Sequence, residues 1–238
     1  MKDWILQIAL ALVIFFGFLR PFVIEAFRIP SQSMERTLLI GDHLLVLKAV
    51  HGQIIPWTDR SEPLLHGFRG GAHGLLMPAT GSFERGEVAV FRYPLDPSRD
   101  FIKRIVALEG DTVQVRSDTL FVNGEPSEWA SCTQSHGDPG IIDDSWPEGL
   151  AMIRGRVADL ELDRISEGVV RLEDGSLAYV VPEHHIFMMG DNRDHSSDSR
   201  IWGPLDMDLV KGPALVTYWS WDGNGGLPRI GRMARIIR

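Results

Sequence analysis

Cysteine is nearly absent from this sequence of 238 residues, which contains only Cys132. One cysteine cannot form an intramolecular disulfide, so disulfide-stabilised scaffolds are excluded. The surrounding residues, EWASCTQSHGDPG, are polar and include no lysine or arginine that would lower the pKa of the thiol. The sequence therefore gives little support to a cysteine nucleophile.

Positive charge is also in short supply, with 24 Lys plus Arg against 32 Asp plus Glu and a net charge of -8. A body of this charge repels phosphate backbones, so we expect no nucleic-acid partner. The exception is the C-terminal tail, residues 226–238, where Arg229, Arg232, Arg235 and Arg238 recur at every third position. We interpret it as a solvated basic tail, with contact to a membrane surface as the alternative.

Metal-binding motifs are missing. The sequence has no H-E-x-x-H and no paired C-x-x-C, and DNRDHSSD fails the calcium-loop template because Arg193 and His195 occupy ligand positions. We therefore predict neither a metal ion nor a cofactor.

One long apolar run is present, from Trp4 to Leu19, with Gln7 as its only polar residue. At about 1.5 Å per residue it spans roughly 24 Å, slightly short of a hydrocarbon core, but the flanking Lys2, Trp4 and Phe22 can extend it. The bulky, charged residues that follow, RPFVIEAFRIP, do not form a small-x-small cleavage site. We expect an uncleaved transmembrane anchor over residues 1–20, whose orientation the flanking charges leave open.

Helix signals are few after this run. Short β-branched segments separated by Gly, Pro and Asp indicate a mainly β fold. The segment TVQVRSDTLFVNGEP predicts a β-hairpin followed by a turn at Asn123-Gly124. Residues 51–85 are rich in Gly, Pro and His and indicate a long loop. Residues 127–155 are acidic and turn-rich, as expected of an insertion in a second, smaller domain.

Two serines, Ser31 and Ser33, lie just after the apolar run in RIPSQSMERTLLIGD. A serine hydroxyl is a nucleophile only when a base lies within hydrogen-bond reach. A Ser-His-Asp arrangement would use His184, His185 or His195, but no G-x-S-x-G elbow surrounds either serine. If His184 and His185 lie on a strand, they point to opposite faces, which suits neither a triad nor a shared metal.

Lys103 is the other candidate base, in DFIKRIVALEGD. Strand alternation places it on the same face as Phe101 and Ile105, where loss of water would lower its pKa from about 10.4 and create a neutral amine. The alternative is that Lys103 extends to solvent or pairs with a carboxylate.

Three segments in this order closely resemble type I signal peptidase, the membrane-anchored serine protease family that removes signal peptides from exported proteins. They are PSQSMERTLLIGD, RGEVAVFRYP with FIKRIVALEGD, and GDNRDHSSDSRIWGPL. The likeness covers residues 29–42, 85–113 and 189–205, with a weaker match in ALVTYWSW. The resemblance implies that Ser33 is the nucleophile and that Lys103 is its general base. It also implies that the Ser31 hydroxyl and the Ser33 N–H together form the oxyanion hole. Without that chemistry, the two serines would be ordinary turn residues after Pro30.

The resemblance also assigns supporting residues in the third segment. Ser196 matches a serine that orients the lysine amine, and Asp198 and Arg200 match an ion pair that holds its loop. A simple loop hydroxyl and a purely structural ion pair are the alternatives. Residues 190–192 are expected to shape a turn rather than to contact substrate.

Substrate selection after small-x-small sites requires shallow apolar pockets. The resemblance suggests that Ile29, Met34, Leu38 and Ile102 line them, with ordinary strand core as the alternative. One departure concerns Arg36, because the family usually has S-M-x-P-T-L where this chain has SMERTL. The turn loses a residue that restricts φ and gains a charge.

The resemblance implies a mainly β fold: a signal-peptidase-like β-barrel or sheet core, a smaller inserted β domain and one N-terminal transmembrane helix. The expected divisions are an anchor at 1–20, core at 21–112, insertion at 113–183, core at 184–225 and basic tail at 226–238. The expected location is the cytoplasmic (inner) membrane, with the catalytic domain on its extracytoplasmic side. Expected partners are exported preproteins, the lipid bilayer and the secretion translocon.

Three alternatives remain open at this point. The first is a processing peptidase of narrow specificity, and the second is a self-cleaving regulator of the same broad fold, against which the anchor argues. The third is a membrane-tethered binding module without activity, which the presence of both Ser33 and Lys103 disfavours.

Overall fold

The computed structural model describes residues 3–15, 23–48, 50–51, 81–116, 119–129, 168–172, 175, 177–222 and 226–238. Within them the chain is mainly β, as predicted. Cys132, most of the expected loop 51–85 and most of the acidic stretch 127–155 lie outside the described residues.

In the described part of the chain, the larger sheet has eight antiparallel strands, in the order β1-β2-β12-β3-β4-β10-β11, with β13 paired to β12. Its strands are β1 (Ile24–Arg28), β2 (Asp42–Leu47), β3 (Val88–Tyr93), β4 (Asp96–Ala107), β10 (His185–Met189), β11 (Leu205–Asp206), β12 (Val210–Ser220) and β13 (Arg235–Ile236). Strands from both ends of the sequence are therefore neighbours: β2 pairs with β12 over Asp42↔Ser220 to Val46↔Ala214. This pairing brings the C-terminal part of the chain close to the segment that carries the serines.

The smaller sheet has five strands among the described residues, in the order β7-β6-β5-β9-β8. Its strands are β5 (Thr112–Arg116), β6 (Thr119–Val122), β7 (Glu125–Pro126), β8 (Val169–Arg171) and β9 (Leu177–Val180). The predicted hairpin is confirmed, since β5 and β6 pair antiparallel. The predicted turn is also confirmed: Asn123 and Gly124, with φ of 54° and 81°, connect β6 to β7. Both residue types tolerate this left-handed conformation.

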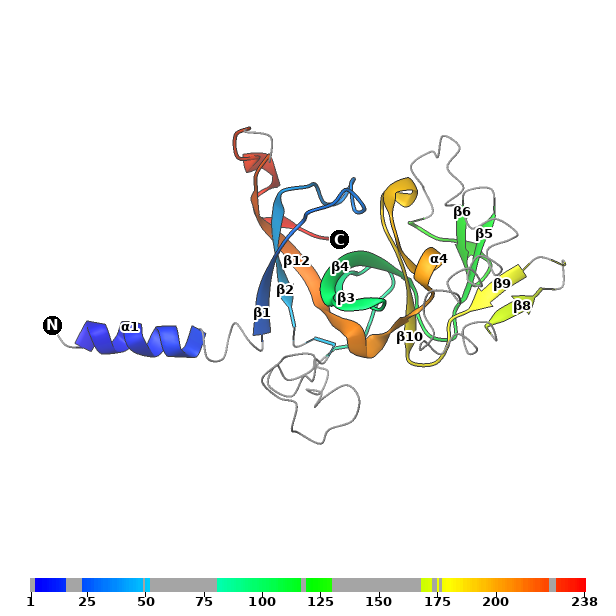
Figure 1. Cartoon of the computed structure of the whole chain (residues 1–238), viewed down its shortest axis with the longest axis horizontal. Coiled ribbons are helices and arrows are strands. Elements are labelled where there is room, and N and C mark those ends of the chain that lie inside the picture. Colours follow the sequence, from blue (N-terminus) through cyan, green and yellow to red (C-terminus); the bar gives the residue numbers. More distant parts are fainter. Residues whose placement is uncertain are drawn as a thin grey trace.

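Helix α1 (Asp3–Ile14) lies at the opposite end of the molecule from the smaller sheet (Figure 1). Its side chains are exposed from Trp4 onward and pack against neither sheet. Residues 1–2 and 16–20 of the expected anchor lie outside the described residues. None of the helices in the described residues combines the length and the apolar character that a membrane span requires.

Among the described residues, the buried apolar side chains form three clusters, and β4 contributes to all of them. Ile102 belongs to a cluster with Leu44 and Val46, Ile105 to one with Trp202, and Val106 to one under the smaller sheet. Residues 102–107 of β4 are consequently buried on both faces. A charged side chain in this stretch is therefore withdrawn from water. This burial is costly in free energy unless a partner neutralises the charge.

Short helices complete the described chain: η3 (Arg193–His195), α4 (Ser199–Trp202), η4 (Met207–Leu209) and η5 (Ile230–Arg232). One premise about the histidines is wrong. His184 does not lie on a strand with His185 but in the preceding turn, with a left-handed φ of 61°. The two rings are therefore not set on opposite faces by strand alternation.

Candidate active site

Ser33 and Lys103 contact each other where a loop packs on the larger sheet. Ser33 is in the loop that joins β1 to β2, hereafter the serine loop (residues 29–41), and Lys103 is on β4. Lys103 Nζ is 2.8 Å from Ser33 Oγ and 2.9 Å from the carbonyl oxygen of Ile102. The two residues are only 6% and 3% exposed. The hydroxyl and the amine are thus within hydrogen-bond distance of each other, and both are shielded from bulk water.

Burial lowers the pKa of Lys103 to about 8. The nearby carboxylates Asp198 and Asp191 oppose this shift, while the positive charge of Arg200 reinforces it. Lys103 Nζ also lies 5.3 Å from the centre of the Phe101 ring, which confirms that the two side chains share a face of β4. With this pKa about one Lys103 side chain in ten is neutral at pH 7, against fewer than about one in 10³ for an ordinary lysine.

The serine loop is closed by its own backbone. Gly41 N donates to the carbonyl of Ile29 at 3.0 Å, and the amides of Thr37 and Leu38 donate to the carbonyl of Met34 at 3.1 and 2.8 Å. Arg36 has a φ of 106° within this turn, a conformation that proline cannot adopt. The exposed hydroxyl of Ser31 lies 3.5 Å from that of Ser33.

A second loop, the 190–198 loop, braces the serine loop. Asn192 donates from its backbone N–H to the Ser33 carbonyl at 3.0 Å and from its side chain to the Gln32 carbonyl at 3.2 Å. Gly190 packs so closely that an added Cβ would lie 2.5 Å from the Ser33 carbonyl oxygen and 2.2 Å from Ser196 Oγ. Residues 190–192 therefore contact the loop of the nucleophile candidate directly, besides shaping a turn.

Asp198 and Arg200 form a buried, two-pronged ion pair. Arg200 Nε and Nη2 lie 2.8 and 2.9 Å from the two oxygens of Asp198, and Gly190 N donates to the same carboxylate at 2.9 Å. Burial by itself would raise the pKa of Asp198, but the charge and hydrogen bonds of Arg200, with smaller contributions from Gly190 and Ser196, hold it below its usual value. Asp198 also accepts a hydrogen bond from Arg200 N at the start of α4.

Ser196 lies beside this pair and is buried. Its hydroxyl is close enough to help lower the pKa of Asp198. Among the described residues, however, it meets no partner with hydrogen-bond geometry, so the structure gives no bond between Ser196 and Lys103. The orienting role that the resemblance implies for Ser196 stays a prediction.

Sequence reasoning missed a second buried ion pair, between Arg104 and Asp191. Arg104 Nε and Nη2 lie 2.8 and 2.7 Å from the carboxylate oxygens, and Thr37 Oγ1 donates to the same carboxylate. Arg104 is next to Lys103 in the chain, so its guanidinium links β4 to both loops. The sequence did hold a signal for this ion pair. Lys103 and Arg104 are adjacent in an apolar run, and a second buried charge requires a partner.

The four predicted pocket residues, Ile29, Met34, Leu38 and Ile102, lie in one hydrophobic cluster. All four are buried, and Ile102, at 9%, is the most exposed of them. The structure brings the three side chains from the serine loop together with Ile102 of β4, and their contact with substrate stays a prediction.

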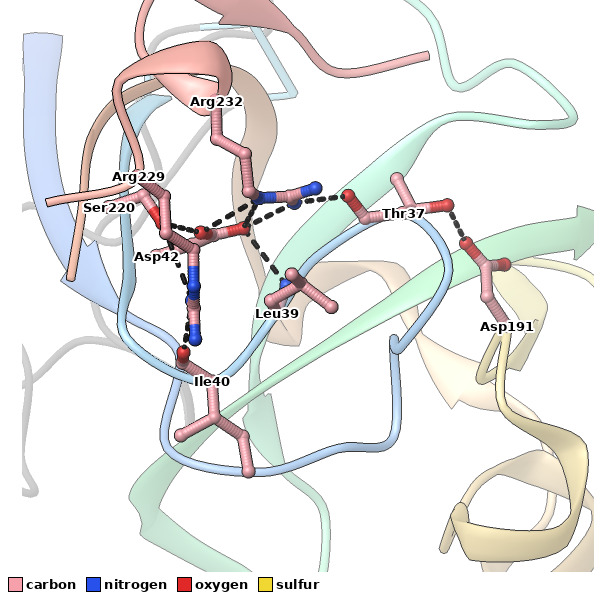
Figure 2. Close-up of polar contacts among 8 residues, drawn as sticks. All are labelled: Thr37, Leu39, Ile40, Asp42, Asp191, Ser220, Arg229 and Arg232. Atoms are coloured by element: carbon pink, nitrogen blue, oxygen red, sulfur yellow. Dashed lines mark hydrogen bonds and ion pairs between the residues drawn. The ribbon is translucent and has the colours of Figure 1, made fainter. Parts of the chain in front are cut away.

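The interpretation of the C-terminal tail as solvated is wrong for two of its arginines. Arg229 donates to the carbonyl of Ile40 at 2.9 Å, and Arg232 forms an ion pair with Asp42 and donates to the carbonyl of Thr37 (Figure 2). These contacts arise because β12 places the tail beside the start of β2.

His184, Asp206 and Asp208 offer ligand atoms that lie within 4.8 Å of one another. The His184 ring is exposed and already lies 3.0 Å from an oxygen of Asp208. A surface ion pair accounts for this cluster without a metal.

The family model described as "Signal peptidase, peptidase S26" matches residues 1–219. The chain is 35% identical to signal peptidase I of Pseudomonas fluorescens over 85% of this chain and 67% of that protein. It is 33% identical to signal peptidase I of Pseudomonas aeruginosa, over 92% of this chain and 73% of that protein. It is also 33% identical to signal peptidase I of Aquifex aeolicus, over 85% and 78%.

A solved signal peptidase I structure from Enterococcus faecalis also matches, with 26% identity and a TM-score of 0.33, covering 56% of this chain and 96% of that one. Because that TM-score is low, the assignment rests on the sequence comparisons. They confirm the resemblance predicted from the three segments around Ser33, Lys103 and Asp198, and the chain belongs to the signal peptidase family, peptidase S26.

Proposed function

We propose that this chain is a signal peptidase I that uses Ser33 as nucleophile and Lys103 as general base. It would cleave exported preproteins after small-x-small sites. The observation that carries the proposal is the 2.8 Å separation of Lys103 Nζ and Ser33 Oγ in a site where burial lowers the pKa of the lysine. A buried amine of this kind meets the requirement of a serine nucleophile for an adjacent base.

The chemistry follows from this geometry. Neutral Lys103 takes the proton of Ser33 Oγ as that oxygen bonds to the scissile carbonyl carbon. The carbonyl oxygen becomes an oxyanion, for which the Ser31 hydroxyl and the Ser33 N–H are the assigned donors. Collapse breaks the C–N bond, and the protonated Lys103 passes its proton to the leaving amine. Lys103 then deprotonates a water molecule that hydrolyses the acyl ester and restores Ser33.

The charges around the site set the pKa of Lys103 in this mechanism. Lys103 becomes an ammonium ion during acylation, and Asp198 and Asp191 favour that charged form. Arg200 opposes it and, by pairing with Asp198, keeps the carboxylate from holding the lysine permanently protonated. The balance leaves a base whose pKa is close to neutral pH, where proton transfer in both directions is efficient.

Substrate would bind as an extended segment beside an edge strand near the serine loop. Its small residues would enter shallow pockets lined by Ile29, Met34, Leu38 and Ile102. These side chains belong to one buried hydrophobic cluster. A bulky residue could enter only by displacing that core, which favours alanine-sized side chains.

Membrane attachment is the second part of the proposal. Residues 1–20 would anchor the chain in the cytoplasmic membrane with the catalytic domain on the extracytoplasmic side, in contact with lipid and the secretion translocon. The supporting observation is that the apolar side chains of α1 face solvent, with Leu6 71% and Val13 67% exposed. A helix this apolar needs a covering, which lipid provides. Extraction of membranes at alkaline pH tests this attachment. The full-length chain should stay in the membrane pellet, and a chain without residues 1–22 should be released into the supernatant.

The deciding experiment compares detergent-solubilised wild type, Ser33→Ala and Lys103→Met on a preprotein with an Ala-x-Ala site. Wild type should cut after the second alanine. Both variants should lose activity, Lys103→Met by at least about 10²-fold, while circular dichroism shows them folded. Cleavage by Lys103→Met at the wild-type rate would refute the dyad. A wild type inert on this substrate but active on a particular native one would favour the narrow-specificity peptidase.

A further inference from the structure

We propose that Arg232, in the C-terminal segment (residues 226–238), is a positioning residue that holds the serine loop in its productive geometry. This inference rests on the proposed function of Ser33. The family model ends at residue 219, so family membership assigns no role to this segment.

The first contact of Arg232 is with Asp42, the residue at which the serine loop enters β2. Arg232 Nη2 lies 2.6 Å from Asp42 Oδ2, and Nε lies 3.2 Å from each carboxylate oxygen. Ser220 Oγ and Leu39 N donate to the same carboxylate at 2.6 and 2.9 Å (Figure 2). Asp42 therefore joins the end of β12, the C-terminal segment and the serine loop at one point.

The Asp42 carboxylate needs Arg232 to remain ionised while buried. Asp42 is 0% exposed, and burial by itself would raise its pKa, but the hydrogen bonds and charge of Arg232, with those of Leu39 and Ser220, hold the pKa below its usual value. Without the guanidinium a buried negative charge would lack its counterion, and the loop would move to admit water or a proton.

The second contact of Arg232 is with the serine loop itself. Its Nη2 donates to the carbonyl of Thr37 at 2.9 Å, while the hydroxyl of Thr37 donates to Asp191 on the other side. Figure 2 shows Thr37 between these two residues, one from the C-terminal segment and one from the 190–198 loop. Thr37 N in turn donates to Met34, the neighbour of Ser33. The position of Ser33 is thus connected to Arg232 through one short turn.

The rest of the segment supports this arrangement. Arg229, three residues earlier on the same side of η5, donates to the carbonyl of Ile40, and β13 pairs with β12 through Val216↔Ile236 and Thr217↔Arg235. The segment is therefore attached at both ends around Arg232. Arg232 contacts Thr37, whose N–H donates to the carbonyl of Met34 beside Ser33. Loss of the Arg232 contacts would therefore shift the nucleophile relative to Lys103, and displacements of about 1 Å can cost on the order of 10²-fold in rate.

Arg235 supplies a matched control. It belongs to the same segment and carries the same charge, but it is exposed, and within the described residues no hydrogen bond or ion pair of its side chain is seen. Arg232→Gln should lower kcat by roughly 10- to 100-fold with little change in KM. Arg235→Gln should stay within about twofold of wild type. Arg232→Lys, which keeps the charge but not the two-pronged geometry, should recover part of kcat.

Two further measurements separate positioning from general stability. The pH at which kcat/KM is half-maximal should be the same in Arg232→Gln as in wild type, because Lys103 and its charged neighbours remain in place. Asp42→Asn should lower kcat in the wild type but much less in an Arg232→Gln background, because both changes break the same link. Rates are expressed per folded enzyme, measured below the thermal transition of each variant.

Wild-type kcat in folded Arg232→Gln would overturn the inference, as would equal losses in Arg232→Gln and Arg235→Gln or additive effects of Asp42→Asn and Arg232→Gln. The proposed function fails separately, if wild type does not cleave the Ala-x-Ala preprotein or Ser33→Ala still does. The two failures are therefore distinguishable in one set of assays.

Discussion

The amine nitrogen of Lys103 lies 2.8 Å from the hydroxyl oxygen of Ser33, although the two residues are 70 positions apart in the chain. Strand β4 carries the lysine through the middle of the sheet, where water is excluded, and the serine loop closes over it. Burial makes a deprotonated amine available, and the short distance lets that amine accept the proton of the Ser33 hydroxyl. The first prediction follows from this combination.

The activity should depend on pH through Lys103. Because the base must be neutral and its pKa is lowered to about 8, kcat/KM should rise with pH, reach half its maximum near pH 8 and level off above. Initial rates on a peptide with an Ala-x-Ala site, from pH 6 to pH 10, measure this. A midpoint near 10.5 would show that Lys103 is not desolvated in the free enzyme.

The same shift predicts a stability effect of Lys103→Met. Burying the charged amine costs the fold about 3 kcal/mol at pH 7, a cost that the variant avoids. Since the folded pKa lies below the unfolded value of 10.5, the unfolded wild type binds more protons between pH 8 and 10.5, and wild-type stability rises across that window. The free energy of unfolding in urea should therefore favour Lys103→Met most at pH 7, with the advantage shrinking toward pH 10.5. A difference independent of pH would contradict this.

Ser31→Ala should lower kcat by about 10²- to 10³-fold, the usual cost of one oxyanion donor. KM should change little, because the donor acts on charge that develops only in the transition state. Ser31 is exposed, so the melting temperature should stay near that of wild type. A variant with full kcat would assign the oxyanion to other donors.

Gly190→Ala should inactivate the enzyme without touching a reacting group. The added Cβ would lie 2.5 Å from the Ser33 carbonyl oxygen, and backbone at that distance must move. We expect a loss of at least about 10²-fold in kcat and of about 1 to 3 kcal/mol in stability. Steady-state kinetics and urea unfolding of the same preparation test both. Near-normal kcat would mean that the 190–198 loop can withdraw without displacing Ser33.

Arg36→Pro should destabilise the serine loop, although the resemblance places proline at this position. Arg36 has a φ of 106°, whereas proline fixes φ near −65°. Arg36→Ala is the matched control, since it removes the same side chain without restricting φ. Arg36→Pro should be less stable than Arg36→Ala by more than about 1 kcal/mol. Equal or higher stability of Arg36→Pro would show that the loop adopts negative φ in solution.

Local patterns in the sequence were enough to predict the β class, the hairpin around residues 112–122 and the turn at Asn123-Gly124. They depend on alternation and on turn residues, which act between near neighbours. The pairing of Ser33 with Lys103 was predicted differently, from the family resemblance together with the apolar setting of Lys103. One premise that failed, a strand through His184, concerned an element boundary, which local patterns define poorly.

Only the tertiary structure revealed the links between Arg104 and Asp191 and between Arg232 and Asp42. These pairs join residues 87 and 190 positions apart, and no sequence pattern relates them. The sequence by itself determined that Arg232 is a cation in a basic tail and that Asp42 follows a turn. Their partnership was decided by the antiparallel pairing of β2 with β12, which withdraws the carboxylate from water and so requires a guanidinium to neutralise it.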